Sequence, residues 1–300
     1  MYNGLTAFQM TAVPGGSKQL VHLKVGLPLA PLNFSNGIEE GGFIPMYPQL
    51  AKPVGNWLLD ALAFEDYERL RSNLEPVSFA LGAVVYESGG QMDHVYFPTT
   101  SHVSLLYTMI DGATAEMGLV GNEGVVGIAL FMGGDATPNR AMVQGAGNAF
   151  RLKAEIMQDE FRRGGEFQHL LLRYTQALIT QISQTAVCNR LHSVEQRLCR
   201  WLLMTRDCTQ SDELQMTQEF ISNMLGVRRE GVTHAASGLQ DEGFISYVRG
   251  HIKILDRQGL EARVCECYGV VKAEHDRLLA RCFDRRVGAD RRFAPDRRRT

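Results

Sequence analysis

Residues 217–237, TQEFISNMLGVRREGVTHAAS, predict two short helices joined by a tight turn. Thr217 can cap the first helix, because a threonine hydroxyl accepts a hydrogen bond from a free backbone N–H of the first turn. Gly226 ends that helix, since glycine adopts the positive φ of a tight turn at little cost. The second helix is expected from about Arg228 to Gln240. This order of helix, glycine turn and helix is that of a helix-turn-helix motif.

Apolar residues in this stretch fall where the two helices must face each other and a common core. They are Ile221, Leu225, Val227, Val232 and Ala235. Ser222 is small, as a close crossing of two helices requires. Gly231, in the first turn of the second helix, costs about 1 kcal/mol relative to alanine. It either permits a close approach to DNA or is a tolerated defect.

The start of the second helix is charged, and in a helix-turn-helix this end enters the major groove of DNA. Arginine can make two parallel hydrogen bonds to guanine O6 and N7, and glutamate can accept one from cytosine N4. The hairpin FISYVRGHIKIL, residues 244–255, turns at Arg249-Gly250 and would form a wing beside the helices. The predicted DNA contacts are Thr217, Arg228, Arg229, Glu230, Thr233, His234, Arg249, His251 and Lys253. The alternative is a capped, solvated helix pair that binds no ligand.

Residues 77–152 show a different residue pattern, in which short β-prone runs are separated by Gly, Asp and Asn. The clearest turn is Asp111-Gly112, which lies between two apolar runs. Several short strands at this spacing predict a β-barrel or jelly roll. Before them, residues 56–77 predict short amphipathic helices, and residues 1–52, rich in Gly, Pro and Asn, are expected to be disordered.

A long helix is predicted within residues 166–191, where apolar residues recur at steps of three and four. The recurring residues are Phe167, Leu171, Tyr174, Leu178 and Ile182. This stripe can pack on its own barrel or pair with a copy of itself. We favour a dimer with Leu171, Tyr174 and Leu178 at its seam, because the helix is longer than one small barrel can cover. Gly164-Gly165 is expected to separate it from a shorter helix, and Ser193 with Gln196 forms a capping-box signature that begins the next one.

The charge of the chain is uneven. Of 300 residues, 31 are basic and 33 acidic, for a net charge of −2. The last sixteen, RRVGADRRFAPDRRRT, hold seven arginines and two aspartates, and without them the counts fall to 24 and 31, a net charge of −7. We expect this tail to be disordered and solvated. The alternative is that its arginines contact the phosphates of a nucleic acid.

The six cysteines are Cys188, Cys199, Cys208, Cys265, Cys267 and Cys282, without C-x-x-C spacing. Cys265 and Cys267 would point about 200° apart on one helix. We therefore expect reduced structural thiols and no metal site. The sequence also has no run of 18 apolar residues and no signal-peptide pattern, so a cytoplasmic protein outside the membrane is expected. No nucleophile–base set is visible, so we expect no catalytic residues and no enzyme activity.

With these residues in view, the chain resembles the cyclic-AMP receptor protein / fumarate-nitrate regulator (Crp/Fnr) family of bacterial transcription factors. The resemblance covers about residues 55–280 and is most specific in TQEFISNMLGVRREGVTHAASGLQDEGFI and RGHIKILDRQGLE. It implies a double-stranded β-helix sensor barrel, a long dimerisation helix and a winged helix-turn-helix. It also implies that Arg229 and Glu230 make base contacts. Arg228 stands where the family usually has a small capping residue, and His234 where a further arginine is frequent.

The resemblance is weaker at the effector site. The matching stretch, GNEGVVGIALFMGGDATPNRAMV, spans residues 121–143. Arg140 fits the family's phosphate-binding arginine, although a structural arginine is an equal alternative. Ala141 replaces the hydroxyl residue that follows it, and Ile128 stands after Gly127 where the ribose-binding carboxylate is expected. Gly124, Gly127, Arg140 and Ala141 are the candidate effector residues. A cyclic nucleotide is therefore a possible cofactor, but weak or no binding of cyclic AMP in the usual pose is expected.

The overall prediction is an α+β protein that acts as a homodimeric regulator of transcription. We divide the chain into a disordered extension (1–52), a sensor barrel (53–158), a dimerisation helix (159–190), a winged helix-turn-helix domain (191–283) and a disordered arginine-rich tail (284–300). The expected partners are double-stranded DNA and a second copy of the chain, with RNA polymerase as a further candidate. The rival is a ligand-binding module whose winged helix docks on a protein instead of DNA.

Overall fold

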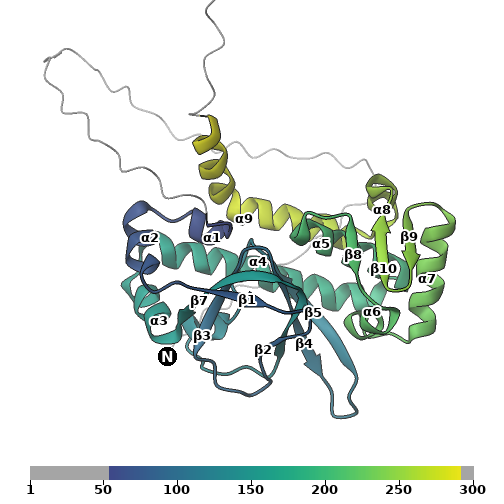
Figure 1. Cartoon of the computed structure of the whole chain (residues 1–300), viewed down its shortest axis with the longest axis horizontal. Helices are drawn as coiled ribbons and strands as arrows, with labels where there is room; N and C mark the ends of the chain where they lie inside the picture. Colours follow the sequence, from purple (N-terminus) through teal and green to yellow (C-terminus); the bar gives the residue numbers. More distant parts are fainter. Residues whose placement is uncertain (1–53, 292–300) are drawn as a thin grey trace, which may run out of the picture. The chain divides into compact units, whose positions relative to one another are not determined.

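The computed structural model describes residues 54–291, with side chains described up to Leu279 (Figure 1). The predicted N-terminal extension, residues 1–52, lies outside this range. The described chain begins with two short helices, α1 (Trp57–Asp60) and α2 (Phe64–Arg71). Asn56 caps α1, and its buried side-chain amide donates hydrogen bonds to the carbonyls of Pro98 (2.8 Å) and Gly124 (2.9 Å). The entry to the fold is thereby tied to the end of β3 and to the loop after β5.

Seven strands then form two antiparallel sheets, as expected for a jelly-roll barrel. One sheet has the order β1-β7-β3 and the other β2-β6-β4-β5. The strands are β1 (Glu75–Phe79), β2 (Val84–Tyr86), β3 (His94–Pro98), β4 (His102–Thr108), β5 (Thr114–Val120), β6 (Arg140–Gly145) and β7 (Gly147–Lys153). Val95, Phe97, Val103 and Val143 are fully buried in the core between them. The predicted turn is confirmed, with Gly112 at φ 86° between β4 and β5.

Two helices follow the barrel, α3 (Ala154–Arg163) and α4 (Gly165–Leu191). Gly164 separates them with φ 82° and ψ −159°, a conformation that glycine adopts far more readily than other residues. The break is confirmed, but it lies inside the range 159–190 that was predicted as one dimerisation helix. The long helix therefore begins at Gly165.

The predicted seam of α4 is wrong. Leu171, Tyr174 and Leu178 are at most 2% exposed and pack in the core with the barrel of their own chain. Gly124 permits this packing, because a Cβ there would lie 2.4 Å from the Tyr174 hydroxyl. The barrel covers this face of α4 after all. A second face carries the helix's exposed large apolar residues, which are Leu172, Ile179, Val187 and Leu191.

The next segment has the winged helix-turn-helix order. Its elements are α5 (Val194–Thr209), β8 (Glu213–Gln215), α6 (Gln218–Leu225), α7 (Arg229–Asp241), β9 (Ile245–Val248) and β10 (His251–Ile254). The capping box of Ser193 and Gln196 at the start of α5 is confirmed. Strand β8 was not predicted, because its three residues carry too little pattern; it pairs with β10 and completes the sheet β8-β10-β9.

The single last helix predicted over residues 259–279 is also wrong. The chain forms α8 (Arg257–Arg263) and α9 (Glu266–Arg291), with a break at Val264, whose φ of −68° and ψ of 151° are extended. Cys265 thus precedes α9, and the helical argument that separated it from Cys267 fails.

Helix α9 packs along α4 in the opposite chain direction (Figure 1). Gln176 Nε2 donates to Glu274 Oε1 at 3.4 Å, and Leu278 and Leu279 join the barrel core. The α9 backbone continues through residue 291, so the tail predicted from residue 284 is helical in its first part, and residues 292–300 lie outside the described range. None of the helices within residues 54–291 is long and apolar enough to cross a membrane.

Candidate nucleic-acid interface and ligand pocket

The start of α7 presents three charged side chains to solvent: Arg228, Arg229 and Glu230. Arg228 is the N-cap residue, with φ −69° and ψ 146°, and its side chain makes no capping hydrogen bond. The guanidinium is therefore not used to close the helix. Arg229 and Glu230 occupy the first turn, the part of a recognition helix that contacts base edges.

Local chemistry sets the position of α7. Thr217 Oγ1 accepts a hydrogen bond from the Phe220 N–H at 3.1 Å and caps α6 as predicted. Gly226 ends α6 in the left-handed conformation, with φ 60° and ψ 42°. Arg197, from α5, donates to the carbonyl oxygen of Leu225 and closes the end of α6.

The predicted core between the helices is largely confirmed. Ile221, Leu225, Val232 and Ala235 are buried, whereas Val227 is only half-buried. These contacts fix which face of α7 points outward. On that face lie Thr233 and His234, both exposed.

Gln218 is a further residue at this interface that the sequence analysis missed. Thr233 Oγ1 lies 3.0 Å from Gln218 Oε1 and 3.0 Å from the Arg229 carbonyl oxygen. The amide of Gln218 thus lies beside the exposed face of α7 that carries Thr233. Its place directly after the Thr217 cap was the only signal that could have indicated this.

Gly231 faces the interior of the domain. A Cβ there would lie 3.9 Å from the two Val194 methyl groups of α5, an ordinary van der Waals distance. A side chain at this position would therefore point toward α5 and away from the exposed face of α7. The position has room for a methyl group.

The wing turns where predicted. Arg249 has φ 49° and Gly250 φ 83°, so both central residues of the β9–β10 turn are left-handed, as in the tight hairpin turns that match strand twist. Arg249 and His251 are exposed at the turn. Lys253 is also exposed, but its Nζ lies 3.2 Å from Glu213 Oε1 on β8. Of the predicted wing cations, Lys253 thus has a carboxylate partner within its own sheet.

The structure does not bring the four candidate effector residues together as a phosphate site. Arg140 Nε lies 3.3 Å from Glu87 Oε2, so a carboxylate already accompanies this guanidinium. Ala141 is fully buried and pairs with Leu105 across β4 and β6. Gly124 packs against α4, and only Gly127, at φ 98°, lines a cavity.

That cavity, of about 290 Å³, lies between the barrel and α4. It is lined by Tyr86, Met92, Leu105, Val125, Val126, Gly127, Ile128, Ala129, Met132, Gly134, Thr137, Asn139, Leu178 and Ile182. Most of these side chains are apolar. The Tyr86 hydroxyl donates to Asn139 Oδ1 at 2.9 Å, and burial raises the pKa of Tyr86. A ligand in this cavity would contact mainly apolar side chains and the hydrogen-bonded pair of Tyr86 and Asn139.

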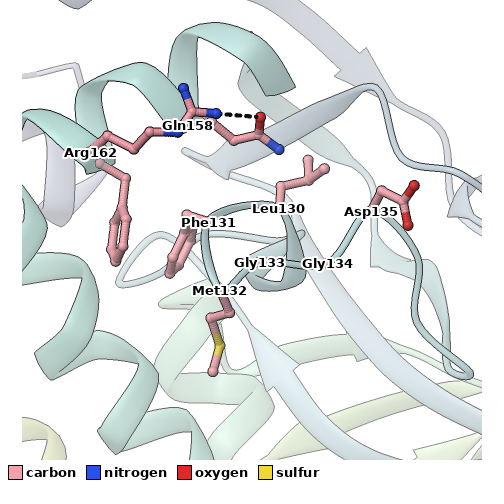
Figure 2. Close-up of a pocket in the computed structure, with 9 residues that line it drawn as sticks. Leu130, Phe131, Met132, Gly133, Gly134, Asp135, Gln158 and Arg162 are labelled. Carbon is pink, nitrogen blue, oxygen red and sulfur yellow. Dashed lines mark hydrogen bonds between the residues drawn. The ribbon is translucent and has the colours of Figure 1, made fainter.

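A second, more open cavity of about 690 Å³ lies between the loop of residues 130–135 and α3 (Figure 2). Leu130 and Phe131 belong to the 3-10 helix η1 (Ile128–Phe131). Across from them, Arg162 Nη2 donates to Gln158 Oε1 at 3.3 Å. Arg162 also pairs with Asp159 at 2.7 Å, so its charge is balanced within α3.

Comparison with known proteins agrees with this geometry. Residues 196–263 match the Crp-like helix-turn-helix domain. A Crp/Fnr-family transcriptional regulator from Eubacterium rectale has a similar structure, with 17% identity, a TM-score of 0.57 and coverage of 69% of this chain and 96% of that one. FixK2 from Bradyrhizobium japonicum shows 16% identity and a TM-score of 0.56, over 64% and 98% of the two chains.

The c-di-GMP responsive global regulator CLP of Xanthomonas campestris is similar at 15% identity and a TM-score of 0.54, over 64% and 99% of the two chains. No curated protein sequence matches this chain. The structural likenesses establish the fold, and the matched domain places the helix-turn-helix within it. Residues 196–263 are therefore a Crp-like helix-turn-helix domain, and the barrel and long helix that precede it share the fold of these structures.

Proposed function

We propose that this protein is a transcriptional regulator of the Crp/Fnr type that acts in the cytoplasm as a homodimer on a pseudo-palindromic DNA site, under the control of a small molecule bound by the barrel. The observation that carries the proposal is the exposed pair Arg229 and Glu230 in the first turn of α7. Both side chains extend from a helix whose opposite face is buried, so their direction is set before DNA binds. Docking on a protein does not require this arrangement, and that alternative is not favoured.

The roles of the predicted contacts differ with their surroundings. Arg229 and Glu230 would read base edges, because they lie in the first turn of the helix that enters the groove. Arg249, at the tip of the wing, would hold a phosphate. Lys253 would contribute less than Arg249, since it must first leave Glu213.

Dimerisation would use the outward face of α4. Leu172 and Ile179 are 47% and 52% exposed and lie seven residues apart, which is two helical turns. Val187 and Leu191 extend the apolar face toward the DNA-binding domain. Two such faces packed together would bury these side chains, at about 25 cal/mol per Å² of apolar surface. These roles would divide the chain into a sensor barrel (53–158), a dimerisation helix (159–190) and a DNA-binding domain (191–283). The dimerisation helix itself begins at Gly165, and the C-terminal part of α9 packs with the barrel core.

The effector would occupy the apolar cavity beside α4. Because Leu178 and Ile182 of α4 line it, a ligand there touches the helix that leads to the DNA-binding domain. Its lining favours a small, mainly apolar molecule. The pairing of Arg140 with Glu87 and the burial of Ala141 disfavour cyclic AMP in the usual pose. A contact with RNA polymerase would be a further step after DNA binding.

A randomised-site selection tests the DNA-reading role. The full-length protein should select a two-fold symmetric motif with half-sites about 10 base pairs apart, centre to centre. Arg229→Ala should flatten the preference at one symmetric pair of positions and cost about 1–3 kcal/mol on the best site. Arg162→Ala, an arginine exposed on α3, is the matched control and should return the wild-type motif. An unchanged motif with Arg229→Ala would mean that Arg229 does not read bases.

A further inference from the structure

A compact group of sulfur and nitrogen atoms joins the end of α4 to the start of α9. It consists of Cys188, His192, Cys265 and Cys267, whose potential ligand atoms all lie within 4.8 Å of one another. Cys188 and His192 are one helical turn apart at the end of α4. Cys265 precedes α9, and Cys267 lies in its first turn. The break at Val264 is what lets both cysteines face the same point.

Two of the distances between these atoms match those around one tetrahedral metal ion. Cys188 Sγ and Cys265 Sγ are 3.6 Å apart, and Cys267 Sγ lies 3.5 Å from His192 Nδ1. Ligands bound to zinc at about 2.3 Å (sulfur) and 2.0–2.1 Å (nitrogen) stand roughly 3.5–3.8 Å from each other in a tetrahedron. A disulfide would instead hold the sulfurs about 2.05 Å apart. With all four ligand atoms within 4.8 Å of one another, small side-chain adjustments would close the cluster around one ion.

The histidine is oriented for coordination. Its Nδ1 faces the sulfur cluster, while its Nε2 lies 3.5 Å from Glu266 Oε2. A carboxylate on the far nitrogen favours the tautomer with the proton at Nε2, which leaves the Nδ1 lone pair free for a metal. This arrangement of carboxylate, histidine and metal is a frequent feature of zinc sites.

Burial and charge also separate this cluster from ordinary core thiols. Cys188, Cys265 and Cys267 are at most 3% exposed and form a small cluster of their own, with Val264 as the partly buried apolar residue packed against it. Arg200, on α5, lies beside the cluster and donates from Nη2 to the Thr185 hydroxyl of α4 at 2.9 Å, three residues before Cys188. Nε and Nη1 of this buried arginine have no hydrogen-bond partner among the described residues. Three thiolates and Zn²⁺ carry a net charge of −1, which such a guanidinium would balance.

We propose that Cys188, Cys265, Cys267 and the Nδ1 of His192 bind one structural Zn²⁺ ion that fastens the start of α9 to the end of α4. Three sulfurs and one imidazole, with no open position, are a ligand set typical of structural zinc. The proposal does not depend on which DNA sequence or effector the protein recognises. The expectation from the sequence that the chain has no metal site rested on a helix through Cys265, and this helix does not exist.

The test is metal analysis of the full-length protein, expressed without a histidine tag and purified without chelator. We expect about one zinc per chain by plasma mass spectrometry. Cys188→Ser and Cys267→Ser should each reduce it to a small fraction of that. Cys199→Ser removes an equally buried cysteine outside the cluster and should leave the zinc content unchanged. His192→Cys should retain zinc where His192→Ala loses it.

A second measurement covers the case in which a cysteine variant fails to fold. Zinc-free wild-type protein titrated with Co²⁺ should develop the intense visible bands of tetrahedral cobalt bound to thiolates, and added Zn²⁺ should remove them. Glu266→Gln should weaken zinc binding by about 10-fold, the lower end of the effect of such outer partners. Absence of both zinc and the cobalt bands would overturn the proposal. So would equal amounts of iron and sulfide, or a Cys188–Cys265 disulfide in freshly purified protein.

Discussion

Replacing Glu116 with glutamine should remove a pH dependence from the folding of this protein. Glu116 lies on β5 and is 9% exposed. Burial raises the pKa of its carboxyl group to about 7, although the Ser104 hydrogen bond and the charge of Arg200 act in the opposite direction. Below about pH 7 the folded state therefore favours the protonated, neutral side chain.

The hydrogen bonds around Glu116 support this protonation state. The Ser104 hydroxyl oxygen lies 2.6 Å from Glu116 Oε2 and 2.6 Å from Gln144 Oε1. One hydroxyl hydrogen cannot serve two acceptors at once, so with Gln144 in this orientation a proton on Glu116 supplies the second hydrogen bond. Gln144 Nε2 donates in turn to the Thr205 hydroxyl at 3.3 Å. The chain of hydrogen bonds thus runs from the barrel to α5 of the DNA-binding domain.

The sign and size of this pH dependence follow from the linkage between protonation of Glu116 and folding. The pKa of Glu116 is about 7 in the folded protein against 4.5 for an ordinary glutamate. The stabilisation is therefore fully present below the unfolded pKa and is lost as the pH rises through the folded pKa. A shift of this size corresponds to about 3 kcal/mol, at 1.36 kcal/mol per pKa unit. Most of it should disappear between pH 5 and pH 8.

The assay is the free energy of unfolding of wild type and Glu116→Gln at several pH values between 5 and 8. The difference between the two proteins should change by about 2–3 kcal/mol across this range, with wild type losing relative stability as the pH rises. Glu65→Gln, an exposed glutamate on α2, is the control and should follow wild type. If the wild-type and Glu116→Gln curves run parallel over the whole range, Glu116 is not protonated in the folded state and the reasoning is refuted.

Three further predictions concern the DNA-binding domain and the dimer. Leu172→Glu with Ile179→Glu should give folded monomers in sedimentation, because these side chains lie outside the core; a dimer that persists would exclude this face. Gly231→Ala should raise the free energy of unfolding by about 0.5–1 kcal/mol, since a methyl group fits beside Val194 and alanine favours the helix; lower stability would show that the site is already filled. Arg249→Ala should reduce the salt dependence of DNA binding by roughly one unit of slope, and Lys253→Ala by less because of its pairing with Glu213; equal effects would contradict this ranking.

The sequence by itself determined the local turns and caps of the DNA-binding domain. Gly226, Arg249-Gly250 and the Thr217 cap were all predicted at the positions where they occur. Each depends on the conformational preference or hydrogen-bonding capacity of a few neighbouring residues, and these are properties of the chain itself. The two-sheet barrel was also predictable, because short strands between turn residues repeat along residues 77–152.

Only the tertiary structure decided which face of α4 lies outward. The sequence shows that Leu171 and Leu172 are both apolar, but one is fully buried and the other 47% exposed. A helix with apolar residues on more than one face has several ways to pack. The choice depends on the shape of the barrel and on α9, whose approach along α4 no local pattern encodes.

The same reason applies to the pairs that join distant parts of the chain. Glu87 and Arg140 meet at 3.3 Å and turn a predicted phosphate arginine into a partner of a carboxylate. Cys188 and Cys265 are 77 residues apart and meet at 3.6 Å, because a two-residue break before α9 redirects the chain. Spacing along the sequence describes single helices and turns. Which of them meet is decided by the packing of the whole fold, since each contact must be compatible with all the others.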